Sequence, residues 1–130
     1  MKILNFEKIA FVFMLLILVS CNAQNNQEDD FAKLADMKQT ILIVAGDAST
    51  NDSTDCRYVG LGAKACGGPW EYLVYSTVNT DTLLLLKLVK NYNQFEDELN
   101  RKYGRASDCS IPSPPTIGLV NGRCVDLRGN

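Results

Sequence analysis

The sequence predicts an α+β fold in which one long helix packs on a small, mainly antiparallel sheet stabilised by two disulfides. Residues Trp70 to Thr77 are strong strand formers, and Trp70, Tyr72 and Val74 recur on one side at the period of a strand. The residues from Asp81 to Tyr103 repeat apolar side chains at helical spacing. The Asn121-Gly122 pair between two short apolar runs is the strongest two-residue hairpin signal. Apolar faces of helix and strands need each other for burial, which favours this fold class.

The N-terminus carries the features of an export signal. Lys2 and Lys8 are basic, and Ile9 to Val19 is an unbroken run of eleven apolar residues, too short to span a bilayer. The following Leu18-Val19-Ser20-Cys21 resembles the lipobox of bacterial lipoproteins. That resemblance implies that residues 1–20 are a signal peptide, that the chain is cut before Cys21, and that Cys21 is acylated and attaches the protein to a membrane. The alternatives are a plain signal peptide or a membrane helix with a chance cysteine.

Residues 21–35 are expected to form a flexible tether between the lipid and the folded domain. Asn22 to Asp30 is polar and contains no aliphatic side chain larger than alanine, so it buries too little surface to offset its ordering entropy. Asn22 is not the aspartate that retains enteric lipoproteins in the inner membrane. Gln27 to Asp30 resembles the acidic surface-export tags of Bacteroidota lipoproteins, with a solvated linker as the alternative. The expected location is the cell envelope, at the outer membrane, on its periplasmic face or at the surface.

The remaining residues, 36–130, are expected to form a single domain. Met37 to Ala45 ends in β-branched and aliphatic residues and predicts a strand, and Gly46 to Asp55 consists of turn formers and predicts an exposed loop. Asn79-Thr80-Asp81 can cap the helix that follows, and Gly104 can end it. The two arms of the hairpin are Thr116 to Val120 and Arg123 to Leu127.

Four cysteines besides Cys21 predict two disulfides, because an even set in a small exported domain is typical of a disulfide framework. Their spacing contains no zinc-binding pair, so no metal site is expected. The sequence favours two local bridges, Cys56–Cys66 and Cys109–Cys124, with a crossed pairing as the alternative.

The segment Gly60 to Trp70 contains four glycines, a lysine and a tryptophan. Together with Glu71 to Ser76, Tyr92-Asn93 and Ser107-Asp108-Cys109, its Lys64-Ala65-Cys66-Gly67-Gly68-Pro69 run resembles a family of small secreted or lipid-anchored Bacteroidota proteins with a Lys-x-Cys-Gly-Gly-Pro signature. The resemblance spans about residues 55–124 and implies no particular activity.

The same segment is the candidate binding surface. Glycines are costly in regular structure, and positions that local rules do not explain are often functional. We hypothesise that Lys64, Gly67, Gly68 and Trp70 border a partner-binding surface, with Lys64 as a polar contact and Trp70 as an aromatic anchor. The competing interpretation makes Trp70 a core residue and the glycines turn geometry.

Composition narrows the functional classes. The 130 residues carry a net charge of −2 without a basic patch, so no nucleic-acid partner is expected. The chain has no histidine, which removes Ser-His-Asp and Cys-His catalysis, and no nucleotide-binding loop is present. Lys64, Glu71 and Asp108 are the only candidates for catalytic groups, and they are weak ones; no cofactor is expected.

The sequence predicts a non-enzymatic binding module for a protein, peptide or glycan. The alternative is a protease inhibitor that presents Lys64 on a loop closed by Cys56 and Cys66.

Overall fold

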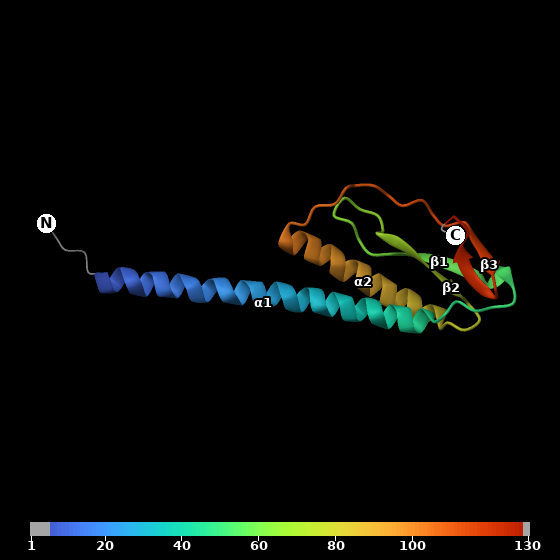
Figure 1. The fold of residues 1–130 in the computed structure, drawn as a ribbon, viewed down its shortest axis with the longest axis horizontal. Coiled ribbons are helices and arrows are strands. Elements are labelled where there is room, and N and C mark those ends of the chain that lie inside the picture. Colours follow the sequence, from blue (N-terminus) through green and yellow to red (C-terminus); the bar gives the residue numbers. More distant parts are fainter. Residues whose placement is uncertain (1–5, 129–130) are drawn as a thin grey trace. The chain divides into compact units, whose positions relative to one another are not determined.

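A computed structural model describes residues 6–128, with side chains from residue 26 onward. The chain divides into two parts, Met1–Lys33 and Leu34–Asn130, which are described separately. The elements in chain order are α1 (Phe6–Ala45), the single 3-10 turn η1 (Ser53–Asp55), β1 (Cys56–Leu61), β2 (Glu71–Ser76), α2 (Thr82–Tyr103), β3 (Ile117–Val120) and β4 (Arg123–Asp126). Helices and antiparallel strands confirm the α+β class (Figure 1).

The expected strand at Met37 to Ala45 is wrong, because these residues form the end of α1. The β-branched run suggested a strand, but the buried side chains Leu34, Ile41 and Ala45 recur at helical spacing. Leu42 and Ile43 consequently point outward and are 41% and 70% exposed. The segment 21–35, expected to be a flexible tether, also has a helical backbone. Its Gln, Glu, Ala and Lys residues are good helix formers, and this local preference favours a helix even where little surface is buried.

The predicted helix after Asp81 is confirmed in α2. The Asp81 side chain accepts a hydrogen bond from the Leu84 amide at 3.0 Å and caps the N-terminus. Gly104 ends the helix in a left-handed conformation, with φ of 59°, and its amide bonds to the Asn100 carbonyl. The buried face includes Leu85, Val89 and Leu99, as the apolar spacing predicts.

The strands form two separate antiparallel hairpins rather than one sheet. β2 confirms the strand predicted around residues 70–77, and it pairs with β1, which the sequence did not reveal because Gly60 interrupts its alternation. The β3–β4 hairpin is confirmed at its turn, where Asn121 and Gly122 have φ of 51° and 74°. β1 lies against β3, and β2 lies against β4. The chain at Ala48 to Thr50 adds hydrogen bonds to the β3–β4 hairpin, so part of the expected exposed loop is buried.

The four cysteines other than Cys21 are oxidised, but the predicted pairing is wrong. Cys56 bonds to Cys124 and Cys66 bonds to Cys109, with Cα–Cα distances of 5.5 and 5.2 Å. The bridges are nested, so they are neither the two local ones nor the crossed pair. Local pairing fails because Cys56 and Cys66 lie at opposite ends of β1, and because β1 and β2 pack against β3 and β4, which brings Cys56 to Cys124.

The core has two parts. The larger set of buried apolar side chains comes from α1, the first hairpin and α2: Leu34, Ile41, Ala45, Leu61, Tyr75, Leu85, Val89, Tyr92 and Leu99. The smaller cluster surrounds the Cys56–Cys124 bridge and joins the two hairpins through Ala48, Val74, Ile117 and Leu119.

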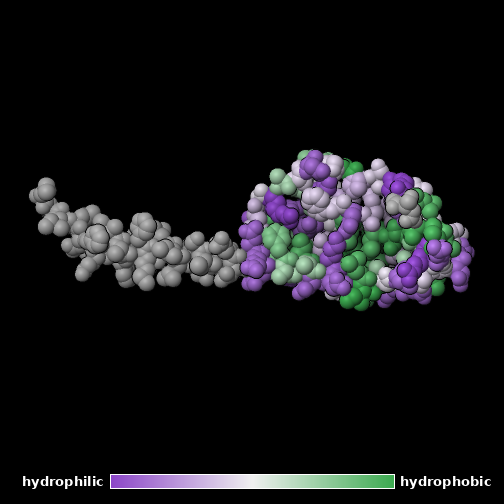
Figure 2. Space-filling model, viewed as in Figure 1, coloured by the Kyte–Doolittle hydropathy of each residue, from purple (hydrophilic) through white to green (hydrophobic). Residues whose placement is uncertain are grey.

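The surface is not uniformly polar. Exposed apolar side chains gather over the end of α1 and the start of α2 (Figure 2), and they include Leu42, Ile43, Leu83, Leu84 and Leu86. Within the described residues, neither helix has the extent of apolar sequence that a membrane crossing requires.

Removing the Cys56–Cys124 bridge with Cys56→Ala and Cys124→Ala is expected to lower the free energy of unfolding by about 4 kcal/mol, because the bridge closes a long loop. The sequence separations, 68 residues for this pair and 43 for Cys66–Cys109, predict similar chain-entropy contributions. In urea unfolding, removing the buried Cys56–Cys124 bridge should lower the free energy of unfolding more than removing Cys66–Cys109, because it also leaves a cavity. A larger loss for Cys66→Ala with Cys109→Ala would contradict this account.

Candidate functional site

The candidate site is the loop that joins β1 to β2, residues 62–70, together with the segment after α2, residues 105–111. Backbone hydrogen bonds shape the loop: the Lys64 amide donates to the Gly68 carbonyl at 2.9 Å, and the Gly67 amide donates to the Lys64 carbonyl at 2.8 Å. The Trp70 amide donates to the Leu61 carbonyl at 3.0 Å and closes the loop at its base. The loop is therefore an ordered turn, not a flexible glycine-rich linker.

Two of its glycines have structural reasons to be glycine. Gly62 has φ of 89°, and a Cβ there would lie 2.6 Å from Trp70 Cδ1, so only glycine lets the indole lie against the backbone. Gly67, with φ of 93°, has nothing within 4 Å of an added Cβ and requires only the backbone conformation. Gly67 and Gly68 are both exposed on the loop.

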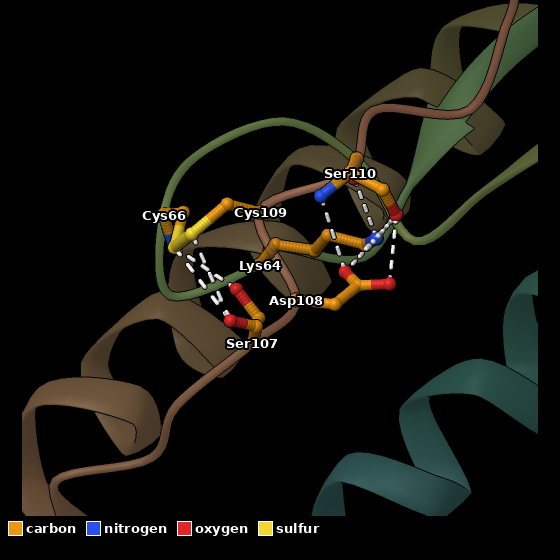
Figure 3. Close-up of polar contacts among 6 residues, drawn as sticks. All are labelled: Lys64, Cys66, Ser107, Asp108, Cys109 and Ser110. Carbon is orange, nitrogen blue, oxygen red and sulfur yellow. Dashed lines mark hydrogen bonds and ion pairs between the residues drawn. A yellow bond between two sulfur atoms is a disulfide. The ribbon is translucent and has the colours of Figure 1, made fainter.

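Lys64, which the sequence suggests as a polar contact for a partner, is buried in the structure. Its side chain is 5% exposed, and its ammonium Nζ donates to Asp108 Oδ1 at 2.8 Å, Ser110 O at 2.6 Å and Ser110 Oγ at 3.0 Å (Figure 3). The Nζ atom also lies 4.8 Å from the centroid of the Trp70 ring. Since an ammonium has three N–H groups, its donors are all used within the chain.

The ammonium in turn organises the segment that surrounds it. Ser110 Oγ donates to Asp108 Oδ2 at 2.8 Å, and the Ser110 amide donates to Asp108 Oδ1 at 3.2 Å. Hydrogen bonds from Lys64 first, and from Ser110 second, lower the pKa of Asp108 from 3.8 to about 2. Asp108 is therefore a charged acceptor at neutral pH, not a group poised to exchange a proton.

α2 holds the other side of the loop with three polar side chains that were not among the site residues expected from the sequence. Asn93 accepts from the Gly62 amide at 2.8 Å and donates to the Gly60 carbonyl at 3.1 Å. Buried Glu96 accepts from the Ala63 amide at 2.8 Å, and buried Asn100 donates to the Ala63 carbonyl at 2.7 Å. Their spacing of three and four residues places them on one helical face, a pattern visible in the sequence.

Trp70, considered above as an aromatic anchor or as a core residue, is partly exposed. It is 40% exposed and precedes β2, so it is neither a core residue nor fully free. It borders a surface pocket of about 330 Å³ whose charged and aromatic lining residues are Lys38, Trp70, Glu71, Tyr92, Glu96 and Arg105. Burial first, and then the negative charges of Glu96 and Glu71, raise the pKa of Tyr92 to about 12, so its phenol stays protonated at neutral pH. The pocket thus presents aromatic surface with charges of both signs.

The geometry on which the protease-inhibitor alternative rested is absent. Cys56 pairs with Cys124, so no disulfide closes a loop between Cys56 and Cys66. Lys64 points into the protein, where it cannot enter the specificity pocket of a protease. Cys21 and its lipobox lie outside the residues whose side chains the structure describes. The described residues contain no group of three or more His, Cys, Asp or Glu that could hold a metal ion.

Comparison with known proteins finds no family model that matches the chain, and no similar curated protein or solved structure.

Acidification is expected to weaken the Lys64–Asp108 contact. Because the folded-state pKa of Asp108 is about 2 and its ordinary value is 3.8, the carboxylate stabilises the fold above pH 4, and this contribution is lost as the pH falls toward 2. Urea unfolding of Asp108→Asn between pH 6 and pH 2 should show a smaller pH-dependent loss than the parent chain. Asp126→Asn is the matched comparison, since Arg128 lowers the pKa of Asp126 to about 2 elsewhere in the domain. An unchanged slope for Asp108→Asn would refute the contact's role.

Proposed function

We propose that this protein is a lipid-anchored component of the bacterial cell envelope that binds a peptide or protein partner and catalyses no reaction. The observation that carries the export part is the oxidation of all four cysteines in the domain. Disulfides form and persist in oxidising compartments and are rare in the cytosol. The apolar run before Cys21 and the lipobox support the anchor.

The proposed location is the outer membrane. It rests on two features of the sequence. The run from Lys64 to Pro69 resembles the signature of small Bacteroidota envelope proteins, and Gln27 to Asp30 is an acidic cluster. The polar segment after Cys21 would separate the domain from the lipid surface. Both the periplasmic face and the cell surface agree with this placement.

The absence of catalysis is proposed because the candidate groups already have structural roles. Lys64 donates all three of its N–H groups to Asp108 and Ser110, and Glu71 accepts from Lys38 at 2.5 Å. A nucleophilic lysine needs a free amine, and an acid–base carboxylate needs a pKa near the working pH. The low pKa of Asp108 is the opposite of that requirement.

The proposed contact surface is the pocket beside Trp70. A partly exposed tryptophan supplies apolar area at small entropic cost, and tryptophan is enriched among the residues that dominate binding free energy. Lys38, Glu71 and Arg105 place both signs of charge around it, which suits a peptide with complementary charges better than a nucleic acid. Gly67 and Gly68 let the loop approach a partner closely at its exposed tip.

Replacing Cys21 with serine is expected to move the protein from the membrane fraction to the soluble fraction, because acylation needs the thiol. Mass spectrometry of the detergent-extracted parent should show a chain that begins at Cys21 and carries acyl groups. The double variant Cys66→Ser with Cys109→Ser should remain in the membrane. Unmodified full-length parent in the soluble fraction would refute the anchor.

Replacing Trp70 with alanine is expected to weaken partner capture about tenfold, the effect of losing a modest aromatic anchor. The measurement is quantitative cross-linking of the oxidised domain to peptides and proteins of the envelope fraction. Tyr58→Ala is the matched control, because Tyr58 is an aromatic side chain 41% exposed on β1 and does not line the pocket. Equal capture by Trp70→Ala, or no capture by the parent, would remove this surface.

A further inference from the structure

The two disulfides differ in their access to solvent. Cys56 and Cys124 are 1% and 5% exposed, beneath the packed hairpins. Cys66 and Cys109 are both exposed, one on the loop before β2 and the other on the segment after α2. Thiol–disulfide exchange begins with direct attack of a thiolate on sulfur, so the rate depends on access to that atom. Only the second bridge offers that access in the folded protein.

The exposed bridge fixes the segment that covers Lys64. All three acceptors of the Lys64 ammonium belong to Asp108 and Ser110, the two neighbours of Cys109 in the chain (Figure 3). On the other side of the bridge, the Cys66 amide donates to Ser107 Oγ at 3.3 Å. Cys109 has φ of 54°, a conformation that a side chain other than glycine adopts at a cost. The bridge therefore holds a strained backbone in the position that buries the lysine.

The contacts that hold the rest of the fold do not involve this bridge. Hydrogen bonds with the side chains of Asn93, Glu96 and Asn100 hold the loop backbone at residues 60–63 against α2. Cys56–Cys124 joins the hairpins independently. Opening Cys66–Cys109 would leave these contacts in place and loosen mainly the segment from residue 106 to 111.

We propose that Cys66–Cys109 is a thiol–disulfide exchange site for an external dithiol, and that its reduction uncovers Lys64 beside Trp70 while the remaining fold persists. One thiolate of the dithiol attacks a sulfur of the bridge, the Cys66–Cys109 bond breaks, and the released cysteine thiolate takes up a proton. The second thiol of the donor loses its proton and attacks the mixed disulfide. Two electrons pass to the protein, the donor becomes a disulfide, and both cysteines end as thiols.

The reduced form would present a different surface. A lysine ammonium freed from Asp108 and Ser110 would add a positive charge next to the exposed indole. Any consequence for partner binding rests on the proposed function of the Trp70 pocket. The exchange site itself does not rest on that function, because it is tested by the reactivity of thiols and amines.

The first test measures the rates at which the two bridges are reduced in one molecule. The oxidised full-length chain is incubated with dithiothreitol under native conditions, quenched by alkylation at successive times, and mapped by peptide mass spectrometry. Cys66 and Cys109 should be alkylated at least ten times faster than Cys56 and Cys124, with unchanged circular dichroism. The difference should disappear in guanidinium, where access is equal. Similar rates in the native protein, or loss of secondary structure together with the first bridge, would overturn the proposal.

The second test measures exposure of Lys64. An amine-acylating reagent should modify Lys64 several times faster after selective reduction, whereas Lys90, already exposed on α2, should react at the same rate in both states. Cys66→Ser with Cys109→Ser should show the fast Lys64 reaction without reductant. Unchanged Lys64 reactivity in both the reduced protein and this variant would mean that the Lys64–Asp108 contact alone keeps the segment closed, and would overturn the uncovering step.

Discussion

The Cys56–Cys124 disulfide joins the first residue of β1 to β4, and with them two hairpins that have no hydrogen-bonded strand in common. An isolated two-stranded hairpin is marginally stable in water, because it buries too little apolar surface. The bridge lies within a small cluster with Ala48, Val74 and Ile117, so the covalent bond and the packing occur at the same place. This junction positions β1 and β2, and therefore the loop between them, against α2.

That loop depends on a second constraint, the satisfaction of buried polar groups. The Gly60 carbonyl and the backbone groups of Gly62 and Ala63, at and just beyond the end of β1, form hydrogen bonds with side chains of α2. The Lys64 ammonium is buried beyond them, and a buried cation is tolerated only with a partner charge and filled donors. Asp108 and Ser110 supply both. The conformation of the segment after α2 thus follows from the burial of one lysine.

Glycine content alone would have been a poor guide to function in this loop. Gly62 is required by its backbone angle and by the contact with Trp70, and Gly67 by its backbone angle alone. Both reasons belong to folding. What remains for binding is the exposed loop tip, the exposed part of Trp70 and the mixed charges around it, which come from α1, β2, α2 and the chain after α2. The proposed surface is therefore assembled from distant parts of the chain rather than contained in one motif.

Local sequence determined α2 with both of its caps, the β2 strand, the turn at Asn121-Gly122 and the oxidised state of the cysteines. Each depends on neighbouring residues or on composition, so no distant partner had to be known. Tertiary structure alone decided that residues 37–45 are helical, that Cys56 reaches Cys124, and that Lys64 is buried. The physical reason is the same in the three cases: a β-branched run, a thiol and an ammonium each accept several environments. The selection among them is made by long-range packing, which places Ile41 in the core, Cys56 next to Cys124, and Asp108 next to Lys64.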